Sequence, residues 1–543
     1  MNYSQFLNMI PEATLTLALI IVFCADFALH RSTPVEEAAI SSQPASRRTF
    51  VLSVLTGALL LCQLVPCFLA KPTTAFGGLY VTYPIVTVMK TILTLGTFIV
   101  VVMSQKWLNS GQRFQALQDG AEANSQLSAL NSKLSGEYYM LILSTLLGMY
   151  VMMSSGHFLL FFLGLEMASV PMACLVAFDK YKRDSAEAAA KYILTATFSS
   201  GVMLYGISFL YGATGTLYFD DMAAIIAQNF RPDSWAAMLG WLFSESPLLT
   251  MGLVFFFSGL GFKISLVPFH FWTADTYQGA PTPVTGYLSV VSKGAATLTL
   301  AIILMKVFGA MVDVWEPLLW IVIMLTITVG NLFAIRQTEL KRFMAFSSIS
   351  QAGYIMLAVV GNSGAGLAAL TFYVLVYVAA NLAVFTVISA VEHSQSSQLS
   401  QWSQRSQQSQ LTQMSAYNGL YQTNPKLALL MTLALFSLAG IPPFAGMFSK
   451  FFVFMAAVGG HESAPFWPYF VVFIALINTV VSLYYYLLIV KAMYITKEEH
   501  PLPTFRNGAA INWSLAICTA GILLFGICSC IYEWIDRAAT AAM

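Results

Sequence analysis

Charged residues are scarce in this sequence of 543 residues, where they make up 9% of the chain, against about 25% in an ordinary soluble domain. Hydrophobic residues make up 58%. A chain with so few charges cannot cover the surface of large soluble domains, which excludes that class of protein. The 26 basic and 25 acidic residues nearly balance, so there is no basic surface for nucleic acid either. We therefore expect an integral membrane protein.

The sequence also lacks the motifs of cofactor sites. None of its seven cysteines forms a CxxC pair or lies at ligand spacing from a histidine, which argues against an iron–sulfur cluster, a zinc site and a disulfide framework. No GxGxxG follows a predicted strand and no P-loop occurs, so nucleotide and flavin sites are not indicated. We expect this chain to bind no metal and no cofactor.

Long apolar runs fill the chain instead. A window of about 19 residues finds fourteen of them, near residues 9–29, 50–70, 79–103, 138–154, 156–178, 188–211, 247–274, 283–308, 315–335, 342–361, 363–392, 426–457, 466–495 and 511–532. The first run follows an uncharged N-terminus, so we interpret it as a retained span and not as a cleaved signal. The predicted fold class is an all-α integral membrane protein with about 14 transmembrane helices.

Basic residues test this count, because short cytoplasmic loops are enriched in lysine and arginine. Seventeen lie in loops after odd-numbered spans, and four lie in loops after even-numbered spans and in the two tails. One missed or invented span would move every later loop to the other side and destroy this asymmetry. We therefore predict that both termini face outward.

Five lysines remain, and all lie within spans or at their edges: Lys90, Lys191, Lys263, Lys293 and Lys450. A cation at the bilayer centre costs about 2.5–3.5 kcal/mol on insertion scales, so several in one chain indicate a function. For Lys90, the simpler interpretation is a side chain that reaches the headgroups or binds a backbone carbonyl. Lys191 follows Glu187 by one turn, so an ion pair along the helix is an alternative there.

Glu166 differs from most acidic residues, because it lies centrally in the fifth span and not at a span edge or in a loop. One explanation is a protonated glutamic acid that is bonded to a neighbouring helix. The other is a countercharge for a buried lysine. The two charges of such a pair stabilise each other to an extent that changes with the distance between them, so the pair can act as a switch.

Two spans are interrupted in a matching way. Glycine and proline occur at mid-span in 258–275 and in 437–454, and such breaks free backbone groups that only protein or water can satisfy. The breaks are five spans apart, so the two segments run in opposite directions through the bilayer. This pattern is typical of inverted repeats, here helices 4–8 and 9–13. Lys263 and Lys450 lie in the broken helices 7 and 12, and Lys293 in helix 8 could bridge the first break.

Several long segments around these residues match a known family: GLEMASVPMACLVAF (164–178), AAAKYILTATFSSGVMLYGISFLYGATG (188–215), GFKISLVPFHFWTADTYQGAPTPVTGYLSVVSK (261–293), GNLFAIRQTELKRFMAFSSISQAGY (330–354) and SLAGIPPFAGMFSKFFVF (437–454). They resemble the antiporter-like membrane subunits of respiratory complex I, most closely the subunit N family of NADH-quinone oxidoreductase. The resemblance is strong over 138–495 and rests on position alone for the first three helices and the last. The long C-terminal extension of the largest relative is absent.

The resemblance implies four parts: helices 1–3 with their loops over 1–137, a first antiporter-like repeat over 138–308, a second inverted repeat over 315–495, and a C-terminal helix in 496–543. It implies a proton-translocating subunit of NADH-quinone oxidoreductase in the cell inner membrane, driven by quinone reduction elsewhere in the complex. NADH, FMN, iron–sulfur clusters and quinone are then expected in partner subunits. The partners are the other membrane and peripheral subunits and the lipid bilayer.

The resemblance also implies site residues. Glu166, Lys263, Lys293 and Lys450 correspond to the ionisable residues of helices 5, 7, 8 and 12, which form a proton relay at half-membrane depth in the family. Lys191 corresponds to a lysine early in helix 6, which we expect to modulate the Glu166–Lys263 pair. Lys90 has no counterpart.

Three further features accompany the relay. Residues 394–413 are rich in serine and glutamine, which predicts a flexible cytoplasmic loop. The aromatic runs at 269–272 and 484–486 could suggest a quinone pocket, but aromatic packing is the simpler interpretation. His270 follows the Pro268 break, where it either helps to hydrate the break or is a satisfied structural histidine.

Two other classes of function stay open at this point. One is a subunit of a multi-subunit sodium/proton antiporter with the same fold, and the other is a small-solute permease whose lysines bind an anion. A permease would gather its charges at one site, whereas Lys263, Lys293 and Lys450 are spread over several helices. Co-purification with NADH-oxidising partners separates the first class from the complex I interpretation.

The distribution of basic residues predicts which loops face the cytoplasm. Single cysteines placed in 394–413 should react with a membrane-impermeant maleimide from the cytoplasmic side, and cysteines placed near His461 should react from the outer side. Reaction of both positions from one side would contradict the fourteen-helix topology.

Overall fold

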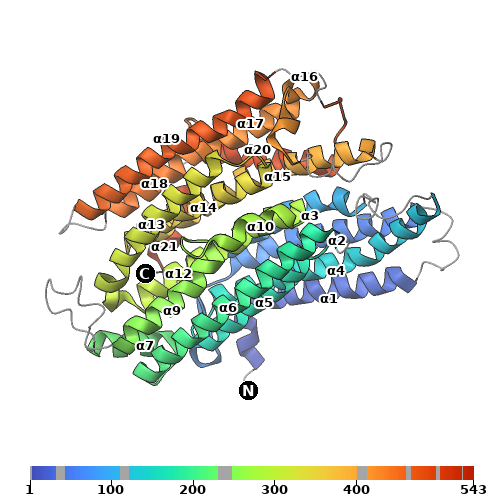
Figure 1. The fold of residues 1–543 in the computed structure, drawn as a ribbon. Coiled ribbons are helices and arrows are strands. Elements are labelled where there is room, and N and C mark those ends of the chain that lie inside the picture. The colour runs from blue at the N-terminus through green and yellow to red at the C-terminus, as the bar shows by residue number, and fades with distance from the viewer. Residues whose placement is uncertain are drawn as a thin grey trace.

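The computed structural model of the chain is almost entirely helical (Figure 1). It describes residues 3–31, 43–109, 121–179, 182–229, 247–399, 412–459, 466–496, 502–528 and 530–542. Within these ranges, 13 helices are long and apolar enough to cross a membrane. The predicted all-α membrane fold is therefore confirmed. Two shorter apolar helices, α17 (Pro425–Ala439) and α18 (Ala445–Gly459), lie where the broken twelfth span is predicted, and the total of fourteen spans stays a prediction.

The N-terminal part consists of four long helices and a small hairpin. Its elements are η1 (Tyr3–Met9), α1 (Ile10–Arg31), α2 (Gln43–Leu69), β1 (Thr73–Ala75), η2 (Phe76–Gly78), β2 (Tyr80–Thr82), α3 (Pro84–Asn109) and α4 (Ala121–Met153). The predicted start of the third span at residue 79 is wrong, because Tyr80–Thr82 pairs with β1 as an antiparallel strand. An apolar run of this length does not distinguish a strand from the first turn of a helix.

The next elements contain the first break: α5 (Phe158–Val176), α6 (Arg183–Thr214), α7 (Phe219–Asn229), α9 (Pro247–Ile264), α10 (Phe271–Gly279), α11 (Thr282–Tyr287), the π-helical turn η5 (Leu288–Ser292) and α12 (Lys293–Lys306). After them come η6 (Gly309–Met311), α13 (Val312–Ile335), α14 (Leu340–Val360), α15 (Gly364–Leu399), η8 (Met414–Tyr417), α16 (Leu420–Thr423), α17, α18 and α19 (Phe466–Tyr494). The chain ends with α20 (Ala509–Ile527) and α21 (Cys530–Thr540).

Three spans form the centre of the bundle. In the most apolar stretches of Thr282–Lys306, of α14 and of α15, 100% of the residues are buried, against 22% in the first span and 33% in α6. Figure 1 shows α12 and α14 lying between the helices of the N-terminal half and α17, α18 and α19. The outer helices therefore offer apolar side chains to lipid, while the central helices are surrounded by protein.

Two glycines let α4 and α5 approach closely. A Cβ atom at Gly148 would overlap backbone atoms of Met167 and Ala168, and one at Gly164 would overlap backbone atoms of Met152. Small residues at such crossings let two membrane helices pack backbone to backbone. The helix that carries Glu166 is therefore fixed directly against α4.

Both interrupted segments are broken in the structure. Helix α9 ends at Ile264 and α10 begins at Phe271, while α17 ends at Ala439 and α18 begins at Ala445. Ser265 and Gly440 adopt positive φ angles of 71° and 88° at these points. In Figure 1 the two broken segments run in opposite directions, as inverted repeats require. The division into two five-helix repeats stays a prediction.

Two predicted boundaries differ from the structure. The predicted single helix over 511–532 is wrong, because α20 ends at Ile527 and a separate helix, α21, follows it. The predicted loop over 394–413 is wrong at both ends, because α15 continues to Leu399 and Thr412 pairs with Leu340. Residues 400–411 and His461 lie outside the described residues.

Candidate functional site

Lys263 lies in the last turn of α9, directly before the first break, and is 5% exposed. Its ammonium nitrogen donates to Ser169 Oγ on α5 at 2.7 Å and to Tyr192 Oη on α6 at 3.2 Å. Within the described part of the chain, no carboxylate lies within 4.0 Å of this nitrogen. Hydroxyl groups therefore replace the water that would solvate the ammonium outside the membrane.

Glu166 lies on α5, three residues before Ser169, so one helical turn separates it from the hydroxyl that binds Lys263. Its buried Oε1 atom has no hydrogen-bond partner among the described residues. Buried acceptors are normally satisfied by protein or by ordered water. The two residues of the predicted pair are thus close to each other through Ser169, but they form no direct ion pair.

Polar atoms gather around the first break. The backbone N–H of Val267 donates to Thr326 Oγ1 on α13 at 3.0 Å, so the second half of the molecule satisfies part of the break. Four buried side-chain atoms have no hydrogen-bond partner among the described residues: Ser265 Oγ, His270 Nδ1, Thr273 Oγ1 and Thr276 Oγ1. Clusters of such atoms favour ordered water. This supports the interpretation that His270 helps to hydrate the break.

Lys293 begins α12 directly after the π-helical turn η5, a feature that occurs frequently at functional sites. It is 2% exposed. Its ammonium nitrogen donates to Ser348 Oγ on α14 at 2.7 Å, and this oxygen lies 3.4 Å from Tyr277 Oη. Among the residues that the structure describes, no acidic side chain lies within 4.0 Å of Lys293. Its surroundings are therefore of the same kind as those of Lys263.

Aromatic side chains connect the two lysines. Tyr192 accepts from Lys263, its ring centroid lies 5.2 Å from that of Trp272, and Trp272 lies 6.5 Å from Tyr277. Tyr277 in turn lies beside Ser348, which accepts from Lys293. The two tyrosine hydroxyls thus mark the ends of a segment that joins the two ammonium groups.

Lys450 lies in α18 after the second break and is 4% exposed. Its ammonium nitrogen donates to the carbonyl oxygen of Ala439 at 2.9 Å. Ala439 is the last residue of α17, so the break frees the carbonyl group that binds the lysine. The ring centroid of Tyr354 lies 4.9 Å from the nitrogen, within the range of a cation–π contact.

A small cavity of ≈ 10 Å³, about the space that one water molecule needs, lies beside Lys450. Gln351, Tyr373, Tyr377, Ser437 and Ser449 are among the residues that line it. Tyr377 Oη and Ser437 Oγ are buried without a hydrogen-bond partner in the described part of the chain. These two atoms offer hydrogen bonds to one ordered water in the cavity.

Helix α14 connects Lys293 with Lys450. Ser348 binds Lys293, Gln351 lines the cavity of Lys450, and the ring of Tyr354 faces Lys450. These three residues are spaced three apart, so they follow one face of a helix that is buried on all sides. Tyr486 of α19 lies 2.5 Å from Ser347 Oγ and accepts from Gln351 Nε2 at 3.3 Å. The polar side chains that join Lys263, Lys293 and Lys450, which we call the polar row, thus continue from the first broken segment to the second.

Lys191 lies outside this row. Its side chain is 44% exposed and forms ion pairs with Glu187 and with Asp275 of α10, both at 2.8 Å. Asp275 also binds Arg342 of α14 at 2.6 Å. The ion pair with Glu187 is present, as the alternative interpretation predicted. Lys191 is the sequence neighbour of Tyr192, so its link to Lys263 runs through the backbone of α6.

Lys90 differs from its sequence-based interpretation. It is 0% exposed, so it does not reach the headgroups, and its ammonium nitrogen lies 2.5 Å from Glu12 Oε1.

Each of the two aromatic runs at 269–272 and 484–486 packs side chains inside the protein. Tyr485 and Trp272 are buried and donate to Asn331 and to the Phe262 carbonyl, which is the packing role predicted for them.

Sequence reasoning missed the uncharged members of the row: Ser169, Tyr192, Tyr277, Ser348, Gln351 and Tyr354. Serine, threonine and tyrosine occur throughout the spans, so no single one of them stands out. One signal was present at 347–351, where SSISQ places several polar side chains in the middle of an apolar run.

Comparison with known proteins gives a consistent result. A family model described as "NADH:quinone oxidoreductase/Mrp antiporter, TM" matches residues 155–482. NADH-quinone oxidoreductase subunit N of Phocaeicola vulgatus is 51% identical over 539 residues, which cover 99% of this chain and 100% of that protein. The matched region of the family model contains Glu166, Lys263, Lys293 and Lys450.

Solved structures have a similar fold. A chain of respiratory complex I from Thermus thermophilus is 28% identical, with a TM-score of 0.66, and the match covers 98% of this chain and 100% of that one. A chain of the Mrp complex from Dietzia sp. has a TM-score of 0.74 at 18% identity, and the match covers 100% of this chain and 97% of that one. The second likeness concerns the fold alone.

Proposed function

The chain belongs to the NADH-quinone oxidoreductase subunit N family, and we propose that it moves protons through Glu166, Lys263, Lys293 and Lys450. It is a membrane subunit of a proton-translocating NADH-quinone oxidoreductase. We place the cofactors NADH, FMN, iron–sulfur clusters and quinone in its partner subunits. In this proposal the chain itself transfers protons and carries out no redox chemistry.

The observation that supports this proposal most strongly is the shared environment of the three lysines. Each ammonium is buried and donates to an uncharged oxygen on another helix: a hydroxyl on α5 for Lys263, a hydroxyl on α14 for Lys293 and the last carbonyl of α17 for Lys450. None of the three has a carboxylate within 4.0 Å in the described part of the chain. An isolated buried charge is costly, so each amine exchanges its proton when its surroundings change.

Protons pass along the row as follows. A protonated lysine breaks one N–H bond, gives the proton to a hydroxyl or to water, and becomes a neutral amine. The next lysine accepts a proton from the same row of hydroxyls and water. A charge on one lysine repels a charge on the next, so the release of one proton favours uptake at the neighbouring site. Glu166 controls the first stage, because its negative charge stabilises the ammonium of Lys263.

Lys191 acts on this first stage from outside the row. Its ion pairs with Glu187 and Asp275 hold the start of α6 against α10. Tyr192, the next residue, binds Lys263. We therefore assign Lys191 the role of positioning Tyr192, which is how it modulates the Glu166–Lys263 pair.

Sodium transport fits these groups less well than proton transport. A sodium ion needs oxygen ligands such as carboxylates and carbonyls. Three of the four ionisable groups of the proposed relay are lysines, which donate hydrogen bonds and repel cations. The same groups bind and release protons directly.

The orientation and the division of the chain belong to this proposal. Seventeen basic residues lie in loops after odd-numbered spans, against four in loops after even-numbered spans and in the tails, which favours a position of both termini on the outer side of the cell inner membrane. The parts 1–137, 138–308, 315–495 and 496–543 are the N-terminal helices, the two inverted repeats and the C-terminal segment. Residues 394–413 then lie on the cytoplasmic side.

The first prediction for the relay concerns Glu166 and Lys263. Glu166→Gln removes the negative charge that stabilises the ammonium, and Lys263→Ala removes the proton carrier. Both variants should assemble into the complex, and both should lower proton-coupled NADH–quinone turnover by about 10-fold or more, as general acid–base groups do. Turnover is measured in reconstituted vesicles, with the assembled amount determined on native gels. Normal coupled turnover in well-assembled variants would contradict the relay.

The second prediction concerns Lys450. A guanidinium keeps its proton at any physiological pH, whereas an amine can release it. Lys450→Arg should therefore lower coupled turnover almost as much as Lys450→Ala, although it preserves the positive charge. Thr432→Val, on the neighbouring α17, is a control that changes a buried hydroxyl outside the cavity. If Lys450→Arg pumps at the normal rate, Lys450 is a fixed charge and not a proton carrier.

A further inference from the structure

A buried ion pair lies in the N-terminal helices, outside the residues 155–482 that the family model matches. Lys90 of α3 is 0% exposed and Glu12 of α1 is 4% exposed. The lysine nitrogen lies 2.5 Å from Glu12 Oε1 and 3.4 Å from Tyr80 Oη. Tyr80, from strand β2, donates its hydroxyl proton to Glu12 Oε2 at 2.9 Å. The three side chains thus form a closed ring of hydrogen bonds.

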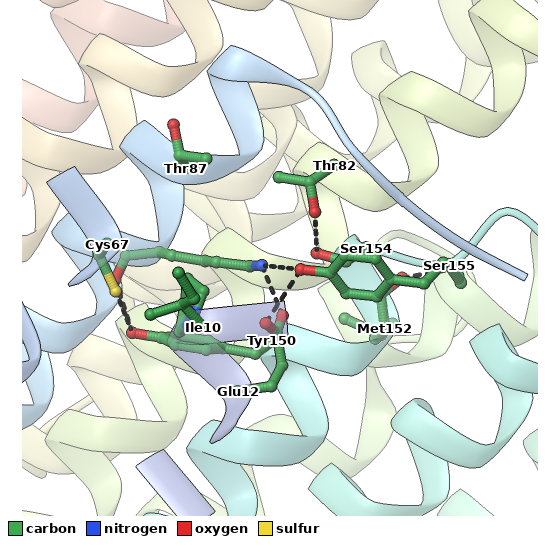
Figure 2. A network of polar contacts seen from close by, with 12 residues as sticks. Ile10, Glu12, Cys67, Thr82, Thr87, Tyr150, Met152, Ser154 and Ser155 are labelled. Atoms are coloured by element: carbon green, nitrogen blue, oxygen red, sulfur yellow. Dashed lines mark hydrogen bonds and ion pairs between the residues drawn. The ribbon is translucent and has the colours of Figure 1, made fainter. Parts of the chain in front are cut away.

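A second layer of polar groups surrounds this ring (Figure 2). Tyr150 of α4 donates to the backbone carbonyl of Lys90 at 3.2 Å, and its ring lies 5.4 Å from the ammonium nitrogen. Its hydroxyl also contacts Thr94 and lies 3.2 Å from Cys67 Sγ on α2. The titratable groups that face the pair are therefore Tyr80, Cys67 and Tyr150. They come from β2, α2 and α4, and none of them brings a second carboxylate or ammonium.

Stability alone gives a weak reason for such a pair. Two charges removed from water lose solvation that their attraction only partly restores, so apolar residues of similar volume often stabilise a fold equally well. The same helices contain a contrasting pair, Arg48 and Asp26, whose atoms also lie 2.5 Å apart. That pair joins α1 to α2 with a cation that cannot lose its proton. The partner of Glu12 is a lysine, Lys90, and a lysine can lose its proton.

The pair lies close to the surface of the bundle. Glu12 is in the first turn of α1, two residues after its start. Above it, Asn8 of η1 donates to the carbonyl of Thr74 at 3.2 Å, and Thr74 in the β1–β2 hairpin is exposed. Glu12 and the hairpin that carries Tyr80 therefore lie at the end of the bundle where α1 begins.

The pair is also linked to the relay by one helix. Tyr150, which contacts the ring, is on α4 two residues after Gly148. Gly148 packs against the backbone of Met167 and Ala168, the residues that follow Glu166 on α5. Helix α4 therefore lies between the Glu12–Lys90 pair and the helix that carries Glu166.

From this geometry we infer that Glu12 and Lys90 form a second proton-exchange site, which binds and releases protons at the end of the bilayer where α1 begins. In the exchange, an N–H bond of Lys90 breaks and an O–H bond forms on Glu12, either directly or through Tyr80, which gives its own proton to Glu12 as it accepts one from Lys90. The charged pair becomes a neutral pair with no change in net charge. Glu12 then releases its proton to water at the surface, and the neutral amine of Lys90 accepts the next proton, which the proposed relay supplies, to become an ammonium again. The inference rests on the proposed function, because it extends the same proton path.

The test uses the assembled complex in proteoliposomes, with electron flow and proton uptake measured together. Glu12→Gln combined with Lys90→Met removes both charges, so it leaves no unpaired charge in the core. We expect this double variant to assemble and to move about twofold fewer protons per electron, or fewer still, as the loss of an ion-pathway residue implies. Asp26→Asn combined with Arg48→Met is the matched control, and it should keep the normal ratio.

Lys90→Arg is the second variant, because it keeps the ion pair and cannot release a proton. It should show the same reduced ratio as the double variant. A normal ratio in either the double variant or Lys90→Arg overturns the inference and makes the pair a structural connection. Glu166→Gln is measured in the same vesicles. If it pumps normally the proposed function fails, whereas normal pumping by the Glu12 and Lys90 variants alone overturns only this inference.

Discussion

The structure depends on one constraint, which is that a charge inside the membrane must be solvated by the protein itself. Water supplies hydrogen bonds to an ammonium group at the surface, but within the bilayer the protein has to provide them. At Lys263 two hydroxyl groups do so, at Lys293 one hydroxyl does so, and at Lys450 a backbone carbonyl does so. Because this solvation is sparse, the charge on each lysine is sensitive to small movements of its neighbours.

The broken helices follow from the same constraint. A continuous helix pairs its backbone groups internally, so a side chain can only share a carbonyl that already accepts a helical hydrogen bond. The end of α17 exposes the Ala439 carbonyl, and Lys450 binds it. At the other break, the backbone N–H of Val267 donates to the hydroxyl of Thr326 on α13, so the first broken segment is attached to the second half of the molecule. The breaks thus supply both polar groups and connections between the two halves.

The charged members of the proposed site stand out in the sequence. Lys263, Lys293, Lys450 and Glu166 could be predicted because a charged residue in an apolar run is rare and costly. Ser169 and Ser348 could not, because serine is common in membrane helices and its role depends on which helix it faces. The partner of Lys90 is a similar case. Glu12 lies at the edge of the first span, and only the fold brings it 2.5 Å from a lysine that is 78 residues later.

The central claim is that the buried lysines carry protons and do not merely hold the helices together. It is tested most directly at Lys293, which lies between the two breaks and is bonded to α14 by Ser348. Lys293→Met keeps the apolar volume and removes the proton carrier. The measurement is the number of protons moved per electron by the assembled complex in sealed vesicles. The account predicts a lower ratio than in the unaltered complex, and an unchanged ratio at normal assembly and electron flow would contradict it.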